Sequence, residues 1–185
     1  MAGIESETMR LTNKNKRRQS GFTLLEAIIS IAVLSFGVLS LAAVYAQGAY
    51  YSAAAQFDYI AEKKAEQAVE AMFTARDIQS LPWASIQNVS QGGVFVDGPQ
   101  RILLPGTDGL VGTQNDLGAA DETVITGAGT TLDLNPFMTR TIAITPVTVA
   151  GVTEVALRQV TVTITYTLGS HQRTYTLVSY ISSYA

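Results

Sequence analysis

The stretch RRQSGFTLLEAIIS, residues 17–30, runs from a basic cluster directly into apolar residues. It opens a run of 25 residues, from Phe22 to Ala46, in which Glu26 is the only charged side chain. A helix of about 20 residues crosses the hydrocarbon core of a bilayer, so this run is long enough to span a membrane. Placing a carboxylate in that core costs roughly 2.5–3.5 kcal/mol. The position of Glu26 therefore needs a physical explanation.

The charges of the chain are divided unevenly along the sequence. Residues 1–21 carry five basic and two acidic side chains, a net of +3, whereas residues 22–185 carry seven basic and thirteen acidic ones, a net of −6. Basic flanks remain in the cytoplasm, so we expect residues 14–18 there and the body of the chain across the membrane. An acidic body also argues against binding to nucleic acid, whose phosphates attract clustered Lys and Arg.

The residue types present exclude several kinds of chemistry. The chain has no cysteine and one histidine, His171. Disulfides, thiolate zinc sites and cysteine nucleophiles are therefore excluded. A Ser/His/Asp relay has no support from a single histidine in a predicted turn, where we expect His171 to be exposed. We predict no enzymatic activity and no cofactor.

Two simpler interpretations of the apolar run compete. A secretory signal peptide would be cleaved after Val44-Tyr45-Ala46, and the pair Arg17-Arg18 resembles part of a twin-arginine signal. The apolar region of a signal peptide has roughly 7–15 residues, however, and this run is far longer. An ordinary single-span anchor that carries a binding domain fits the length but leaves Glu26 unexplained.

The hexapeptide Gly21-Phe22-Thr23-Leu24-Leu25-Glu26 resembles the leader junction of type IV pilins and pseudopilins. Four features coincide: a basic leader, Gly-Phe at the junction, a glutamate five residues after it, and an unbroken apolar helix. The resemblance implies that a prepilin peptidase, which is also the N-methyltransferase, cuts after Gly21 and methylates Phe22. It implies that Glu26 acts in assembly rather than in catalysis.

The resemblance also supplies a reason for the buried charge. A charged group in lipid or in a helix bundle needs a partner, and cleavage would create an amine at Phe22 in the same apolar layer. In the family, the glutamate of one subunit is thought to pair with the N-terminal amine of a neighbour, so the filament removes the penalty. The alternative is that Glu26 lies at the headgroup level and stays hydrated.

The helical pattern continues beyond the apolar run. Apolar residues recur at three- and four-residue spacing and share one face, and charged residues mostly fall elsewhere. We therefore expect one helix from about Phe22 to about Ala75, flexed near Gly37 or Gly48, with Leu81-Pro82 as the stop signal. The predicted face consists of Phe57, Ile60, Ala61, Ala65, Ala68, Val69, Met72 and Phe73.

The rest of the chain reads as strands and loops. Residues 160–166 alternate apolar and Thr side chains with a period of two, and the turn at residues 168–171 makes residues 153–183 a hairpin. An earlier strand covers residues 140–149, with Ile142 and Ile144 inward and Pro146 as a bend or an edge. Shorter strands are predicted at residues 101–104 and 123–126. The fold class is α+β: a pilin-like ladle whose long helix, membrane-embedded in its first half, packs by its second half on a small antiparallel sheet.

The prediction divides the chain into four segments. Residues 1–21 form a cytoplasmic basic leader, residues 22–48 the membrane and assembly half of the helix, and residues 49–77 its periplasmic half. Residues 78–185 form a β-rich head. We expect a single-pass inner-membrane protein with a periplasmic head before assembly, and an extracellular pilus subunit afterwards.

The sequence is most similar to minor pilins of the PilV type. Major pilins often carry a proline where this chain has Ala43, and residues 35–42 and the terminal hairpin resemble the PilV type. The implied function is a minor pilin that enters a type IV pilus or primes its assembly. Its partners would be the prepilin peptidase, other major and minor pilins through the N-terminal helix, and the inner-membrane assembly platform. A pseudopilin of type II secretion is the alternative. The absence of cysteine departs from pilins whose heads carry a disulfide loop.

One loop could bind a metal. Residues 106–116 are rich in Gly and Asp, and calcium takes six to eight oxygen ligands from such loops. Some pseudopilins hold calcium in their heads, so Asp108, Asp116 and Asp121 are candidate ligands. A plain solvated loop is the alternative, because the EF-hand spacing is missing. Trp83 and Phe95 are expected to anchor the core beneath the loops.

Overall fold

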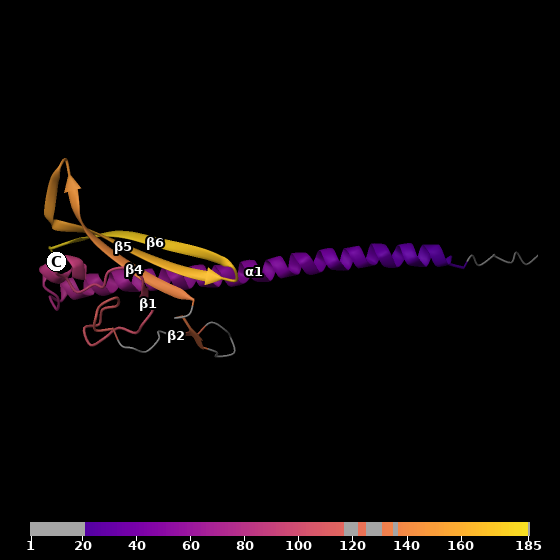
Figure 1. The fold of residues 1–185 in the computed structure, drawn as a ribbon, viewed down its shortest axis with the longest axis horizontal. Coiled ribbons are helices and arrows are strands. Elements are labelled where there is room, and N and C mark those ends of the chain that lie inside the picture. Colours follow the sequence, from indigo (N-terminus) through magenta and orange to yellow (C-terminus); the bar gives the residue numbers. More distant parts are fainter. Residues whose placement is uncertain (1–20, 117–121, 125–130, 135–136, 185) are drawn as a thin grey trace, which may run out of the picture. The chain divides into compact units, whose positions relative to one another are not determined.

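The computed structural model of the chain describes residues 21–116, 122–124, 131–134 and 137–184 (Figure 1). The predicted leader, residues 1–20, and the candidate ligand Asp121 lie outside the described residues. The chain divides between Gln47 and Gly48 into two units. The first unit contains the beginning of the helix, and the second contains the rest of the helix and all of the strands.

Helix α1 (Leu24–Asp77) is the only α-helix of the described part of the chain. Thr23 caps its start: its side-chain Oγ1 accepts a hydrogen bond from the backbone N–H of Glu26 at 3.2 Å, and its carbonyl accepts one from Ala27. The helix is rich in alanine, the best helix former, and has no proline. The predicted helix is confirmed, and both ends lie two residues later than expected.

The part of α1 in the first unit exposes its side chains on every side. All described residues from Gly21 to Ala49 are exposed. Three serines in this part donate their hydroxyl hydrogens to the carbonyl four residues earlier, at 2.7–2.8 Å. These serines are Ser30, Ser35 and Ser40. Such back-bonding satisfies the hydroxyl groups within the helix itself, so the helix presents few unpaired polar groups to an apolar surrounding.

The second unit contains a four-stranded antiparallel sheet with the strand order β1-β4-β5-β6 (Figure 1). The predicted hairpin is β5 (Val152–Leu168) with β6 (His171–Ser182), and the predicted earlier strand is β4 (Met138–Val149). The turn between β5 and β6 contains Gly169 with a φ of 62°, a left-handed conformation that favours glycine. The predicted sheet and its hairpin are confirmed.

The short strands differ from the prediction. Strand β1 covers only Gln100–Arg101, because the chain there pairs with β4 over two residues and then turns Ile102 into the core. Strand β2 (Glu122–Val124) pairs with β3 (Thr131–Asp133) in a separate two-stranded sheet. The sequence pattern did not predict β3, and residues 125–126 of the predicted strand lie outside the described residues. Two short 3-10 helices, η1 (Trp83–Ser85) and η2 (Val89–Gln91), follow α1.

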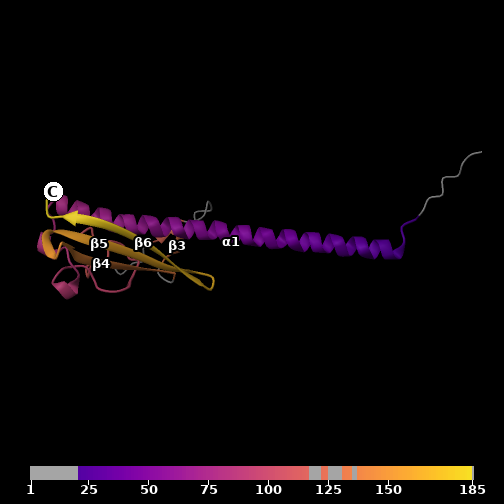
Figure 2. The same cartoon turned by 90° about the horizontal axis from the view of Figure 1, so that it is seen from above.

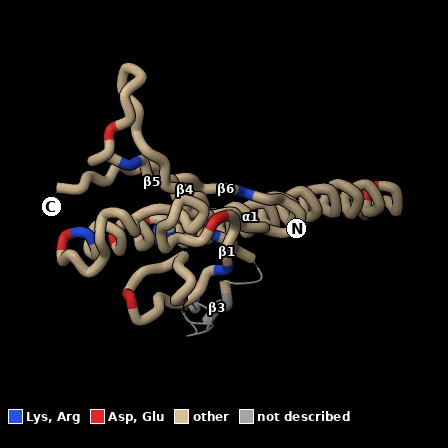
Figure 3. The backbone as a smooth tube through the Cα atoms, turned by 60° about the vertical axis from the view of Figure 1, so that its left-hand side comes forward, with Lys and Arg blue, Asp and Glu red and all other residues tan. Residues whose placement is uncertain are grey.

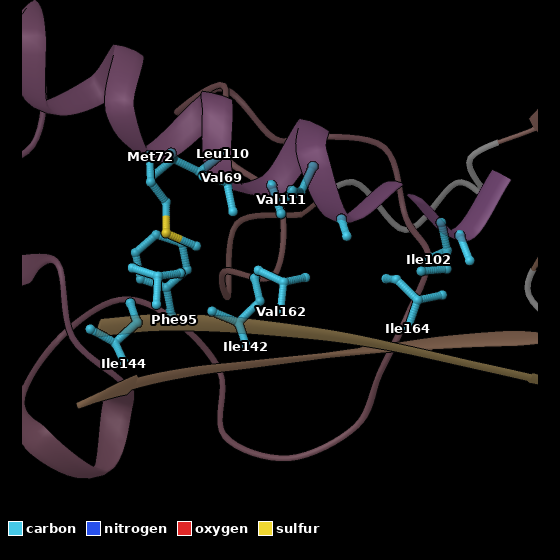
Figure 4. Packing of buried hydrophobic residues seen from close by; sticks show 14 of the residues in the cluster. Val69, Met72, Phe95, Ile102, Leu110, Val111, Ile142, Ile144, Val162 and Ile164 are labelled. Carbon is cyan, nitrogen blue, oxygen red and sulfur yellow. The ribbon is translucent and has the colours of Figure 1, made fainter. Parts of the chain in front are cut away.

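The core of the second unit lies between α1, from Gly48 onward, and one face of the sheet (Figure 2). Figure 4 shows Met72 and Val69 of α1 directed toward Ile142, Ile144 and Val162 of the strands. Phe95 and Leu110 from the connecting segments also join this cluster. The predicted helix face is confirmed: its members are buried, apart from Phe57 and Phe73, which are partly buried and pack against the cluster. Five of the buried helix residues are alanines.

The outer edge of β4 is closed by a side chain. The buried amide of Asn88 donates to the carbonyl of Ile142 and accepts from the N–H of Ile144, both at 2.8 Å. The next residue whose backbone nitrogen faces this edge of β4 is Pro146. Proline has no N–H, so no donor is left unpaired there. Pro146 was predicted to be a bend or an edge: the register of β4 against β5 shifts directly after it, and β1 pairs with β4 only at Thr139 and Arg140.

The register shift makes the end of the β4–β5 hairpin diverge from the sheet. Pro146 faces Arg158, whereas Val147 faces Glu154, so three residues of β5 have no partner in β4. Two backbone carbonyls of this insertion are bonded elsewhere: that of Val155 by the Trp83 indole N–H at 3.0 Å and that of Ala156 by the Ser183 N–H at 2.9 Å. The outer hairpin, residues 147–154, extends beyond this point in Figure 1.

Candidate processing and assembly site

The predicted cleavage position lies directly before α1. Gly21 and Phe22 have no regular secondary structure, and both are exposed, Phe22 by 79%. The helix begins two residues later, behind the Thr23 cap. A peptide bond in an exposed segment without regular structure can enter a protease active site, whereas bonds within a helix cannot without unwinding. The bond between Gly21 and Phe22 is accordingly accessible.

Glu26 occupies the first turn of α1. Its backbone N–H is capped by Thr23, so Thr23-x-x-Glu26 has the spacing of a capping box. A carboxylate in the first turn also interacts favourably with the positive end of the helix dipole, by roughly 0.3–1 kcal/mol. The helix start thus offsets part of the cost of placing this charge in an apolar layer. Sequence reasoning missed this local role, although the Thr-x-x-Glu spacing was visible.

The first part of α1 can cross a membrane by its length and composition. Its most apolar window has a mean hydropathy of 2.5, and none of it is buried within the protein. Figure 3 shows this part of the backbone tube almost entirely without charged residues. A helix with apolar side chains on every side is normally buried, either in a membrane or among other helices.

The two described calcium candidates lie close together around Thr113. Asp108 accepts from the Leu110 N–H at 3.1 Å and the Thr113 hydroxyl at 2.9 Å. Asp116 accepts from the N–H groups of Gly112 and Thr113 at 2.8 and 3.0 Å. Among the described residues, no group of three or more His, Cys, Asp or Glu side chains could hold a metal ion. Both carboxylates act as turn caps in this structure, and the calcium site stays a prediction.

Asp116 also contacts a buried cation that sequence reasoning missed. Arg140 of β4 is 1% exposed, and its guanidinium lies 3.6 Å from the Asp116 carboxylate. The signal was present in the strand pattern, because Arg140 shares the inward-facing alternation of Met138, Ile142 and Ile144. A buried ion pair costs much desolvation energy and loses its compensation when one partner is removed. The pair therefore holds the loop of residues 106–116 in place on the sheet.

A polar cluster joins α1 to the β5–β6 hairpin. The Tyr166 hydroxyl donates to Asp58, and Arg173 forms an ion pair with the same carboxylate at 2.6 Å. Burial, and next the hydrogen bond to Asp58, raise the pKa of Tyr166. The hydrogen bond to Tyr166, and next the charge of Asp58, raise the pKa of Arg173. The Tyr166 ring also stacks on Phe57, with ring centres 5.9 Å apart.

Three further sequence predictions concern the burial of His171, Phe95 and Trp83. His171 is exposed at the start of β6, as predicted. Phe95 is fully buried in the core. Trp83 is half-buried, packs against the core, and lies under the Arg158 guanidinium at 4.2 Å from its ring centre. Arg158 also donates to the carbonyls of Trp83 and Ile86, and burial lowers its pKa.

Comparison with known proteins bears on the N-terminal segment. Residues 16–42 match a family model described as the prokaryotic N-terminal methylation motif. No curated protein and no solved structure matches the chain. The matched residues include the junction at Gly21, the capped start of α1 and Glu26. The chain therefore carries the prokaryotic N-terminal methylation motif, as the resemblance of its leader junction predicted.

Proposed function

We propose that this protein is a minor type IV pilin of the PilV kind, which prepilin peptidase cleaves after Gly21. The observation that carries the proposal is the arrangement of residues 21–26. An exposed Gly-Phe segment without regular structure directly precedes a capped helix whose first turn holds Glu26. Cleavage there would leave an amine at Phe22, one helical turn from Glu26 and at the same end of the apolar helix.

The same arrangement supports a role in assembly. Before cleavage, the basic leader holds the start of the helix at the cytoplasmic face, and the apolar part of α1 lies in the inner membrane. In a filament, the Glu26 carboxylate of one subunit pairs with the methylated Phe22 amine of a neighbour. Two charges that are each costly in an apolar layer then compensate one another, so assembly lowers the free energy of the membrane-embedded helix. The head is periplasmic before assembly and part of an extracellular pilus afterwards.

The proposed partners follow from this pathway. They are the prepilin peptidase and N-methyltransferase, the major and minor pilins that contact the apolar helix, and the inner-membrane assembly platform. The head consists of a packed core and a hydrogen-bonded loop, which fits a structural subunit. Calcium bound by Asp108, Asp116 and Asp121 remains a proposal within this assignment.

The N-terminus of the protein extracted from membranes tests the proposal. Intact mass and the N-terminal peptide should show loss of residues 1–21 and a methylated Phe22. A Gly21→Val variant should keep its leader, whereas Gly48→Ala, which alters a glycine with open space around it, should be processed normally. A chain that keeps Met1 in cells with an active prepilin peptidase would refute the proposal and favour a single-span anchored domain.

The alternative machine is a type II secretion system, whose pseudopilins share the N-terminal chemistry. A photo-crosslinking side chain at Ile29, exposed in the apolar part of α1, should capture pilins of the pilus. Capture of pseudopilins instead would move the protein to the secretion system while leaving its processing unchanged.

A further inference from the structure

A pocket of about 340 Å³ lies in the second unit where α1 ends and the chain turns into η1. Its volume is at the small end of the range for ligand pockets, roughly 300–1,000 Å³. Nothing in the proposed pilin function uses it. Six residues line the pocket: Arg76, Gln79, Leu81, Pro82, Trp83 and Ser183.

The backbone at Gln79 is strained. Helix α1 ends in a Schellman arrangement, in which Ser80 N–H bonds the carbonyl of Ala75 at 3.0 Å and Gln79 N–H bonds that of Arg76 at 3.0 Å. The residue at the turn takes a left-handed conformation, and Gln79 has a φ of 57°. Glycine is the usual residue there because a side chain is unfavourable in this conformation. The chain instead places an amide side chain at this position, and that residue lines the pocket.

Trp83 offers the pocket an aromatic surface. Its indole N–H is already donated to the carbonyl of Val155 at 3.0 Å. One side of its ring is covered by the Arg158 guanidinium, and Arg158 is not among the residues that line the pocket. The part of the indole that borders the pocket is therefore available for apolar contact. Leu81 and Pro82 add to this apolar part of the lining, which is smaller than the polar part.

The remaining lining residues are polar, and the one charged side chain among them, Arg76, is paired with a carboxylate. The Arg76 guanidinium contacts the Asp77 carboxylate through Nε at 2.7 Å and bonds the carbonyl of Ser182 through Nη1 at 3.3 Å. Because Asp77 neutralises this cation, the site does not select strongly for an anion. Gln79 supplies both a donor and an acceptor, and the Ser183 hydroxyl can do the same.

We propose that this pocket binds a neutral saccharide. A sugar ring presents an apolar C–H face beside a rim of hydroxyl groups that donate and accept hydrogen bonds. The pocket has a mainly polar lining that includes Gln79, Ser183 and Arg76, with a smaller apolar part to which Trp83, Pro82 and Leu81 contribute. The acidic balance of the chain, with a formal net charge of −3, further disfavours an anionic ligand.

The chain carries its own reporter for this test. Trp83 is the only tryptophan, so the fluorescence of the full-length protein in detergent reports on the pocket directly. The probes are glucose, galactose, N-acetylglucosamine, N-acetylgalactosamine and cellobiose, each titrated to about 10 mM, ten times a Kd of 1 mM. At least one of them should change the emission of Trp83 saturably. No saturable change with any of them would overturn the proposal.

Gln79→Gly separates binding from stability. We expect the variant to bind the sugar at least tenfold more weakly. We also expect its unfolding midpoint to rise by roughly 2–4 °C, because glycine relieves the left-handed backbone. Gln91→Gly makes the same change at an exposed residue outside the pocket and should leave binding unchanged. Ser183→Ala should weaken binding without this rise in midpoint.

Two results from these variants would contradict the reasoning. Unchanged binding in Gln79→Gly would show that the amide does not contact the ligand. A lower unfolding midpoint would show that the Gln79 side chain is present for packing rather than for binding. Neither result depends on cleavage at Gly21 or on filament assembly, so failure of this inference is distinct from failure of the proposed function.

Discussion

Replacing Asn88 by alanine should destabilise the second unit strongly, because one side chain closes the edge of β4. The Asn88 amide is 5% exposed and forms two hydrogen bonds of 2.8 Å, to the Ile142 carbonyl and the Ile144 N–H. Alanine leaves both of these backbone groups buried without their partner. An unsatisfied buried group costs about 1–3 kcal/mol, so two such groups give an expected loss of about 2–6 kcal/mol of unfolding free energy.

Urea unfolding of the full-length protein in detergent, followed by Trp83 fluorescence, measures this loss. With a denaturant slope of about 2 kcal/mol/M, the midpoint should fall by roughly 1–3 M. Asn115→Ala is the matched control, because Asn115 is exposed and has only a long contact of 3.4 Å to Asp108. A loss for Asn88→Ala below about 0.5 kcal/mol, the usual range for surface substitutions, would refute the idea that the side chain replaces an edge strand.

Three further predictions concern the membrane helix, the polar cluster and a tight turn. Glu26→Gln keeps the shape of the side chain and removes its charge, so N-terminal cleavage should continue while incorporation into filaments, measured in sheared pilus fractions, drops at least tenfold; normal incorporation would exclude charge pairing. The pKa of Tyr166 is raised in the folded state from its usual 10.0, so its contribution to stability is present below pH 10 and is lost as the pH rises further. Alkaline unfolding curves should show this loss, and Tyr166→Phe should remove part of it. Gly93→Ala should cost more than about 3 kcal/mol in urea unfolding, because a Cβ there would lie 2.0 Å from the backbone carbonyl oxygen of Gln87; a smaller cost would mean that this turn is free to shift.

The sequence predicted the elements whose pattern is local. The alternation of residues 160–166 and the recurrence of small and apolar residues along α1 reflect one buried face each, so the hairpin and the packed face of the helix followed from spacing alone. The N-terminal motif also depends on adjacent residues, and the hexapeptide at residues 21–26 was enough to identify its junction. These predictions needed no knowledge of which distant segments meet.

The missed features depend on distant contacts. Asn88 closes an edge more than fifty residues away, and Asp116 meets Arg140 only after the loop has folded against β4. The end of α1 was placed two residues early, because Leu81-Pro82 is a general stop signal and the left-handed turn at Gln79 has no glycine to reveal it. Strand β3 was missed because a three-residue strand carries too little alternation to detect.

The outer β4–β5 hairpin has a practical consequence for the protein as a carrier. Residues 147–154 pair only with one another, contribute no residue to the core cluster, and meet at an Ala150-Gly151 turn. Lengthening such a loop costs only about 0.6 kcal/mol for each doubling. A foreign peptide grafted at this turn would be displayed on a protruding hairpin while the sheet beneath it keeps its register, which makes the hairpin a position for epitope display.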